Sequence, residues 1–407
     1  MHRRNFLKGL GATFALSSMP SAASFAFNPL FGAPNNEEIL VFIFLKGGCD
    51  ALNLLAPVVD QHYVHARPSA LRVSEEANLL LKNGLGGLDF SLHAKAQPLK
   101  ELYDSKDLAF VHAMGNTHNT RSHFEAQQLL EMGWDGKGAS INSGWMARYF
   151  STINTQGLFP AVSFGKQGLS NLLFQHQEAQ AFSNLEDFRI HGGDKAPAML
   201  KAFYQGEGAL AKTGQKTIHN TQQLAEKAEH LHHKHKDYPT GNLIKEFSKN
   251  LRELAQLIQL DTGVQMAVVE MGGWDHHNGQ VYTFAPMIEG FSKALVAFYN
   301  DLQKFHKRLT IVTMSEFGRR LKANKNQGTD HGHAGLSMVL GGRVRGGKMY
   351  GNWPGLAPGQ LNRGVDLEVT TDYRSILSSV LTRRMHTKQL DRIFPNFTPQ
   401  PDLGFLA

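Results

Sequence analysis

The sequence predicts an α/β protein with a mostly parallel central sheet that helices cover on both faces. Continuous apolar runs at 38–45, 263–271 and 309–314 have the length and composition of strands buried on both faces. Glycine-rich turns follow these runs, and segments with helical periodicity separate them. Such alternation is typical of parallel strands joined by helices. The 407 residues are enough for one large domain.

The expected elements alternate along most of the chain. Strands are expected at 38–45, 107–112, 160–164, 263–271, 309–314 and 336–340. Helices are expected at 124–132, at 285–305 and from about 372 to 381. In the second of these, apolar residues share one face: Met287, Ile288, Phe291, Leu295, Phe298 and Leu302.

A helical insertion is expected at about 196–260, where no strand pattern is found. Its second half carries one apolar stripe, formed by Leu243, Ile244, Phe247, Leu251, Leu254 and Ile258. The stretch 217–236 is polar and contains His219, His230, His232, His233 and His235. A surface metal site is one interpretation of this run, and a solvated helix face is the favoured one.

The composition restricts the class of protein. Hydrophobic residues make up 42% of the chain and charged residues 19%, as in a globular protein. The single cysteine, Cys49, excludes an intramolecular disulfide and a cysteine-rich zinc site. The formal net charge is +7, and the body of the chain contains no Lys/Arg block, so we expect no nucleic-acid partner.

The N-terminus is similar to a twin-arginine signal. Arg3 and Arg4 precede a mildly apolar run at 9–26 that is too short and too weakly apolar for a membrane span. We expect residues 1–26 to be a cleaved signal peptide and 27–407 to form a single domain. Loss of Arg3, Arg4 and Lys8 would lower the formal charge from +7 to +4. The expected partner is the twin-arginine translocase, and the expected location is periplasmic or extracellular, without a stable membrane span.

Acidic residues in glycine-rich turns lie at three ends of the expected strands. Asp50 follows 38–45, Asp275 follows 263–271, and Asp330 lies before 336–340. Because parallel strands share one carboxyl edge, these carboxylates can converge although they are far apart in sequence. Imidazole nitrogens and carboxylate oxygens together suit divalent metals. A polar loop whose histidines face solvent is the alternative.

The candidate metal site combines these carboxylates with nearby histidines. The predicted ligands are Asp50, Asp275, His277, Glu316, Asp330, His331 and His333. They are sufficient for one or two divalent ions, and two ions close together would stabilise both oxygens of a displacement reaction. Zn, Mn, Ca and Mg are the candidate cofactors.

The expected catalytic residues lie at the start of the helix 124–132. Ser122 is the candidate nucleophile, because free N–H groups at a helix start favour an anion. Arg121 could bind an anionic substrate with a forked contact, and His123 could neutralise its nonbridging oxygens. The structural alternatives are a surface charge for Arg121 and a helix N-cap for Ser122, with Glu125 completing a capping box.

Six segments resemble those of the domain-of-unknown-function family 1501. They are FIFLKGGCDALN (42–53), NTRSHFEAQ (119–127), GGWDHH (272–277), SEFGR (315–319), GTDHG (328–332) and TDYR (371–374). This family is in turn similar to the alkaline phosphatase and sulfatase superfamily, which implies an alkaline phosphatase-like fold and twin-arginine export. The resemblance implies one metal among Asp50, Ser122, Asp330 and His331. A second would lie at Asp275 and His277.

The sequence therefore predicts an exported metal-dependent hydrolase of phosphate or sulfate esters. Its substrate would be a small-molecule or polysaccharide ester. The alternative is a non-catalytic metal- or polysaccharide-binding or assembly protein that keeps the fold. A redox enzyme is disfavoured because no dinucleotide or haem motif is found.

Overall fold

The computed structural model describes residues 38–407 except 139, 156, 166–167, 186–187, 194 and 230–237. The expected signal peptide lies outside the described residues, as do His230, His232, His233 and His235. None of the helices in the described part of the chain combines the length and apolar character that a bilayer span requires.

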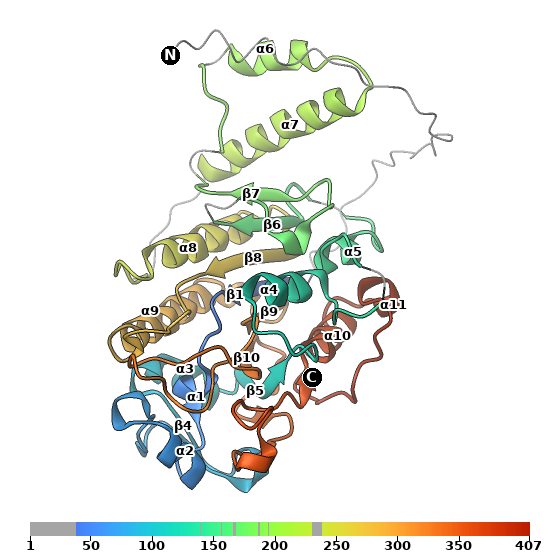
Figure 1. Ribbon diagram of the computed structural model, residues 1–407. Helices are drawn as coiled ribbons and strands as arrows, with labels where there is room; N and C mark the ends of the chain where they lie inside the picture. Colours follow the sequence, from blue (N-terminus) through green and yellow to red (C-terminus); the bar gives the residue numbers. More distant parts are fainter. Residues whose placement is uncertain are drawn as a thin grey trace, which may run out of the picture. The chain divides into compact units, whose positions relative to one another are not determined.

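The central sheet has nine strands in the described part of the chain (Figure 1). Eight of them lie in the order β11-β5-β10-β9-β1-β8-β6-β7, and β12 pairs with β5. The strands are β1 (Ile39–Leu45), β5 (Leu108–Gly115), β6 (Ala161–Phe164), β7 (Gln180–Phe182), β8 (Met266–Met271), β9 (Leu309–Met314), β10 (Gly335–Leu340), β11 (Met349–Tyr350) and β12 (Thr371–Asp372). Only β10 runs antiparallel to its neighbours β5 and β9 among these described strands. The predicted mostly parallel sheet is thus confirmed.

The described residues also form a small antiparallel sheet, eleven α-helices and several three-residue 3-10 helices. The small sheet consists of β2 (Leu55–Ala56), β3 (Leu80–Leu81) and β4 (Phe90–Leu92). The helices are α1 (Ala51–Leu54), α2 (Gln61–Ala66), α3 (Gln97–Asp104), α4 (His123–Met132), α5 (Trp145–Phe150), α6 (Ala196–Phe203), α7 (Ala209–Glu229), α8 (Lys245–Gln259), α9 (Gln280–Asp301), α10 (Tyr373–Arg383) and α11 (Leu390–Ile393).

Helices cover both faces of the sheet, as β1 shows. Its side chains alternate between two cores, because successive residues of a strand point to opposite faces. Ile39, Val41, Ile43 and Leu45 pack into a core with α3, α8 and α9, whereas Leu40, Phe42 and Phe44 pack into a core with α5, α10 and α11. Both faces are therefore buried, and this explains the uninterrupted apolar run.

The region of the predicted insertion contains three helices with different surroundings. α8 belongs to the sheet layer, because its apolar stripe, including Phe247 and Leu251, is buried in the core that also holds α9. α6 has no buried residue. α7 contributes Leu224 to the same core and has mostly exposed side chains, including His219.

His112 on β5 is fully buried between the two sheets. Its Nδ1 accepts a hydrogen bond from the Ala113 N–H (2.9 Å), and its Nε2 donates to the Leu55 carbonyl (3.0 Å). Both nitrogens are satisfied by the neutral imidazole, so a second proton would have no acceptor. Burial lowers the pKa of His112 from 6.5 to about 4.

This lowered pKa predicts acid sensitivity of the fold. Between pH 6.5 and 4, His112 binds a proton in the unfolded chain but stays neutral in the folded protein. The free energy of unfolding therefore falls as the pH falls. From pH 7 to pH 5 this one group should remove about 2 kcal/mol from the free energy of unfolding. In urea denaturation, the free energy of unfolding of His112→Gln should decline from pH 7 to pH 5 by this amount less than that of the wild type. The exposed-histidine variant His219→Ala should keep the full decline, and equal declines in all three proteins would refute the assignment.

Candidate metal centre

The polar loops meet at one edge of the sheet. The loops after β1, β5, β8 and β9 leave the carboxyl ends of strands that run in the same direction. β10 is antiparallel to β9, so the loop 328–333 that enters β10 reaches the same edge. Segments separated by up to about 280 residues therefore come together, as the strand pattern predicts.

Buried hydrogen bonds lock these loops to each other. Glu316 accepts from the backbone N–H groups of Gly47 (2.9 Å) and Gly48 (3.2 Å). Arg319 is 2% exposed and donates to the carbonyls of Gly48 and Thr329, each at 2.8 Å. Glycine is required at 47, because φ is +121° and a Cβ would lie 2.6 Å from the Asp275 nitrogen.

Three imidazole nitrogens surround the carboxylate of Asp275. The Nε2 atoms of His277 and His331 each lie 3.2 Å from Asp275 Oδ1, and His123 Nε2 lies 3.3 Å from Oδ2. His277 Nε2 and His331 Nε2 are 2.8 Å apart. Ligand atoms of His123, Asp275 and His331 all lie within 4.8 Å of one another. We call these four residues the His–Asp cluster.

The opposite nitrogen of each ring is held by an oxygen acceptor. The contacts are His123 Nδ1 to Glu316 Oε1 at 2.8 Å, His277 Nδ1 to Asp330 Oδ1 at 3.1 Å and His331 Nδ1 to the Arg121 carbonyl at 2.7 Å. A carbonyl or an ionised carboxylate can only accept, so each Nδ1 carries the proton. In its neutral form each ring would present a lone pair at Nε2, the arrangement typical of metal-binding histidines.

The cluster fits one divalent cation. His123 Nε2 is buried and makes no well-formed hydrogen bond, although it lies 3.3 Å from Asp275 Oδ2. Imidazole nitrogens and one carboxylate suit zinc or a similar transition metal better than calcium or magnesium, which prefer oxygen ligands. Among the described residues the three-residue group of His123, Asp275 and His331 is the one group with metal-site spacing, so the geometry supports one ion.

The surroundings favour the metal-binding protonation states of Asp275 and His331 and oppose that of His123. Burial would raise the pKa of Asp275, but the hydrogen bond and the charge of Arg319 lower it to about 2. Burial lowers the pKa of His331, which favours the neutral ring. The hydrogen bond to Glu316 raises the pKa of His123, so a metal would displace a proton there more readily as the pH rises.

Other predicted ligands have different roles in this geometry. Glu316 and Asp330 orient His123 and His277 rather than facing the centre of the cluster. Asp50 is 1% exposed, and its oxygens accept from Arg67 (2.7 and 3.0 Å) and Gln280 (2.7 Å). These contacts favour a buried structural ion pair over metal ligation.

His333 lies outside the cluster too. It is 5% exposed, and its Nε2 lies 3.0 Å from the Asn116 carbonyl. His331 and His333 are two positions apart and would face the same side of a regular strand. The chain bends at His333, before β10 begins at Gly335, so the two rings point to different surroundings. The contacts of His333 favour a structural role.

The residues before α4 form the rim of the cluster. Ser122 occupies the N-cap position as predicted, but its side chain makes no capping bond. The expected capping box is therefore wrong: Glu125 accepts instead from Thr120 Oγ1 at 2.5 Å. The Ser122 side chain is exposed, and both flanking residues contact the cluster, Arg121 through its carbonyl and His123 through its ring.

Arg121 is engaged by protein acceptors. Its Nε donates to Asp366 Oδ2 at 2.9 Å, and its other nitrogens donate to Asp366, Asn119 and Asn362. Asp366 is fully buried, so this pair resists separation. The guanidinium therefore stabilises the loop, and the forked contact with substrate stays a prediction.

A family model described as "Protein of unknown function (DUF1501)" matches residues 134–394. The chain belongs to this family, as the sequence motifs predict. The matched segment contains Asp275, His277 and His331, and His123 precedes it. A search of curated proteins finds no match to this chain.

Several solved structures are similar at low identity. The C-terminal periplasmic domain of EcEptC from Escherichia coli, in complex with Zn, is 7% identical and has a TM-score of 0.37, with 75% of this chain and 73% of that chain covered. The PsFucS1 sulfatase from Pseudoalteromonas sp. is 10% identical and has a TM-score of 0.37, with 85% and 67% covered. A protein in the alkaline phosphatase superfamily from Vibrio parahaemolyticus is 11% identical and has a TM-score of 0.34, with 77% and 62% covered.

The His–Asp cluster predicts about one tightly bound divalent metal per chain. His331→Ala and Asp275→Asn each remove a ligand. Elemental analysis of these purified variants should find clearly less than one metal ion per chain. Asp330→Asn removes only the acceptor that orients His277, and should weaken the affinity by roughly 10–100-fold in chelator competition. His219→Ala, an exposed histidine on α7, should match the wild type. Full metal content in both ligand variants would exclude this cluster as the binding site.

Proposed function

We propose that this protein is an exported, metal-dependent hydrolase of phosphate or sulfate esters. The convergence of three Nε2 atoms on the Asp275 carboxylate is the observation that carries this proposal. The side chain of Asp275 is 46% exposed, so a substrate in solution can reach the cluster. A divalent cation held there would supply Lewis acidity toward an ester oxygen and toward a nearby hydroxyl.

Ser122 is the proposed nucleophile. Its exposed hydroxyl is free of the capping bond, and its backbone is fixed beside the cluster by Arg121 and His123. It precedes a helix of ten residues, whose first N–H groups favour developing negative charge. In the proposed reaction, a bond forms from Ser122 Oγ to phosphorus or sulfur while the bond to the leaving oxygen breaks. The hydroxyl proton passes to solvent, and the leaving oxygen takes a proton from solvent and departs as the alcohol. Water then hydrolyses the serine ester, which restores the Ser122 hydroxyl and releases phosphate or sulfate.

The remaining residues have positioning roles in this proposal. Glu316, Asp330 and the Arg121 carbonyl keep the three rings in the tautomer that exposes Nε2. Arg319 holds Asp275 in its ionised form next to them. None of these groups has to move during the reaction, and such preorganisation is what favours a charged transition state.

A non-catalytic metal- or polysaccharide-binding protein is the second candidate. It is favoured by the absence of a general base within hydrogen-bond reach of the Ser122 hydroxyl among the described residues. The two candidates differ in turnover and share metal binding. Activity therefore has to be measured separately from metal content.

Substitution of the proposed nucleophile separates the two candidates. Ser122→Ala should retain the metal and lose at least about 100-fold in kcat toward aryl phosphate or aryl sulfate esters. Wild-type turnover should be lost with a chelator and restored by added metal. Ser105→Ala, which changes a serine next to α3, is a matched control. Unchanged turnover in Ser122→Ala would reject the nucleophile, and no turnover in metal-loaded wild type would favour the binding protein.

Export through the twin-arginine translocase is supported by Arg3 and Arg4 before the run 9–26. The paired substitution Arg3→Lys and Arg4→Lys keeps the charge and removes the guanidinium groups that the signal requires. We expect the variant to accumulate in the cytoplasm of a bacterial host, whereas the wild type reaches the periplasm or medium. Fractionation and immunoblotting measure this, with Lys8→Arg as control. Equal export of the paired variant would exclude this route.

A further inference from the structure

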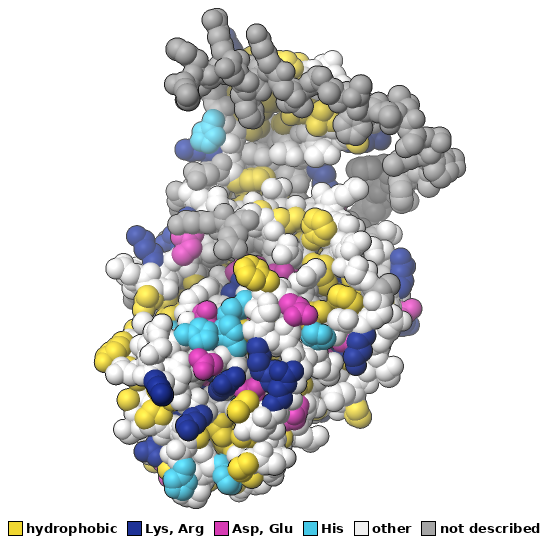
Figure 2. Space-filling model, in the orientation of Figure 1, with side chains coloured by type: hydrophobic (Ala, Val, Ile, Leu, Met, Phe, Trp, Pro, Cys, Tyr) yellow, Lys and Arg dark blue, Asp and Glu magenta, His cyan; other side chains and the backbone are white. Residues whose placement is uncertain are grey.

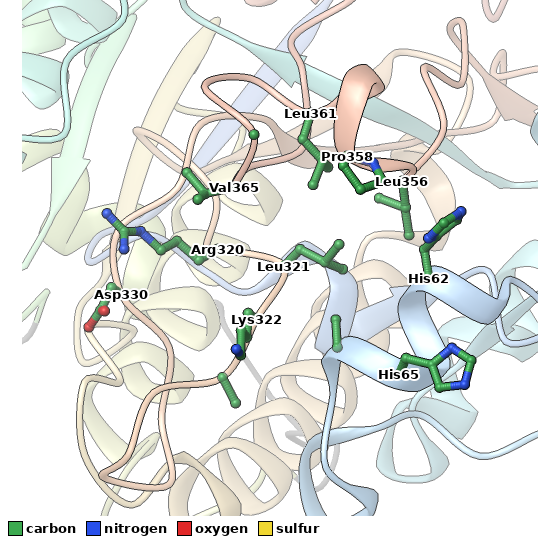
Figure 3. A pocket seen from close by; sticks show the side chains of 13 residues that line it. His62, His65, Arg320, Leu321, Lys322, Asp330, Leu356, Pro358, Leu361 and Val365 are labelled. Atoms are coloured by element: carbon green, nitrogen blue, oxygen red, sulfur yellow. The ribbon is translucent and has the colours of Figure 1, made fainter.

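A pocket of about 450 Å³ adjoins the His–Asp cluster (Figure 3). Asp330 lines the pocket and also accepts the hydrogen bond from His277 Nδ1. One residue therefore belongs both to the pocket and to the support of the cluster. Figure 3 shows Arg320 and Asp330 at one end of the pocket and His62 and His65, from α2, at the other. The volume lies within the roughly 300–1,000 Å³ of small-molecule sites.

The wall of the pocket is apolar and its charges are mainly positive. The apolar side chains are Ala66, Leu321, Ala323, Leu356, Pro358, Leu361 and Val365. Arg320 and Lys322 supply two cations against the single carboxylate of Asp330. Asp330 supplies one negative charge against these two positive ones, and its Oδ1 also accepts hydrogen bonds from His277 and Asn324. Figure 2 shows Lys and Arg side chains next to gathered histidine and acidic groups on this face.

Carboxylates compensate these two cations only in part. The nearest carboxylate to Arg320 Nε is Asp366 Oδ1, at 3.9 Å, and Asp366 already binds Arg121 through its other oxygen. Arg320 Nε is buried without a hydrogen bond. Lys322 is exposed, and no carboxylate among the described residues forms an ion pair with it. Lys322 has no carboxylate partner, and Arg320 has only a distant one that Arg121 shares, so an anion in the pocket would meet positive charge that the protein does not fully compensate.

We propose that this pocket binds the alcohol part of the ester substrate, and that this part carries an anionic group of its own. The inference rests on the proposed ester hydrolysis, which puts the reacting phosphate or sulfate at the His–Asp cluster. The leaving alcohol then extends past Asp330 toward Lys322. The apolar wall contacts its carbon skeleton, which has the size of one sugar or aromatic ring, and the cations select its charge.

Two pairs of aryl esters test this charge selection. They are phenyl phosphate with 4-carboxyphenyl phosphate, and the two corresponding sulfates. The wild type should have the higher kcat/KM for the carboxylated ester. Lys322→Gln and Arg320→Gln should each lose about tenfold in kcat/KM for that ester, mainly through KM. Their kcat/KM for the phenyl ester, whose alcohol part carries no charge, should stay unchanged. Lys325→Gln is the matched control, because this exposed lysine follows in the same loop and does not line the pocket.

Binding of the product alcohols separates failure of this pocket from failure of the hydrolase proposal. Saturation-transfer NMR on the full chain compares 4-hydroxybenzoate with phenol and requires no turnover. Selective 4-hydroxybenzoate binding that Lys322→Gln weakens supports the pocket even if no ester is hydrolysed. Turnover with no preference for the carboxylated ester, and no change in Lys322→Gln and Arg320→Gln, would overturn the pocket and leave the hydrolase proposal standing.

Discussion

The buried guanidinium of Arg319 holds the loops of the candidate metal centre together. It donates to the carbonyls of Gly47, Gly48, Trp274 and Thr329 and to Asp275 Oδ1. A cation that is 2% exposed is stable only when its donors are satisfied, and here backbone from three strand-end loops satisfies them. Displacement of any of these loops would leave a buried charge unpaired. The positions of Asp275 and of the histidines around it depend on this network.

Around this network, the acidic side chains divide into two roles. Asp275 faces the three Nε2 atoms with a pKa of about 2, so it is ionised at any physiological pH. Glu316 and Asp330 instead accept from the Nδ1 atoms of His123 and His277 and fix the orientation of these rings. A carboxylate behind an imidazole also raises its basicity, which increases its affinity for a metal. The same Asp330 borders the pocket with Arg320 and Lys322, so one loop connects metal binding with the proposed recognition of charge.

The strand pattern was sufficient to predict the sheet and the edge at which the site lies. The runs at 38–45 and 309–314 are buried on both faces, and few other structures accommodate such runs in a chain of this size. The short strands β7, β11 and β12 carry too few residues for a periodic signal and were not predicted. α8 was assigned to an insertion because no strand is adjacent in sequence. Its apolar stripe packs on the sheet through residues that are distant in sequence.

Sequence alone determined that strand-end acids and histidines would share one edge, because parallel strands end on the same side. It also indicated the residue types that suit a divalent cation, and the family to which the chain belongs. Only the tertiary structure decided which of these side chains face one another. Asp50 and Asp275 have equivalent places after their strands, yet Asp50 pairs with Arg67 and Asp275 faces the histidines. This difference depends on the direction of each side chain and on partners elsewhere in the chain. The spacing of residues in the sequence contains neither kind of information.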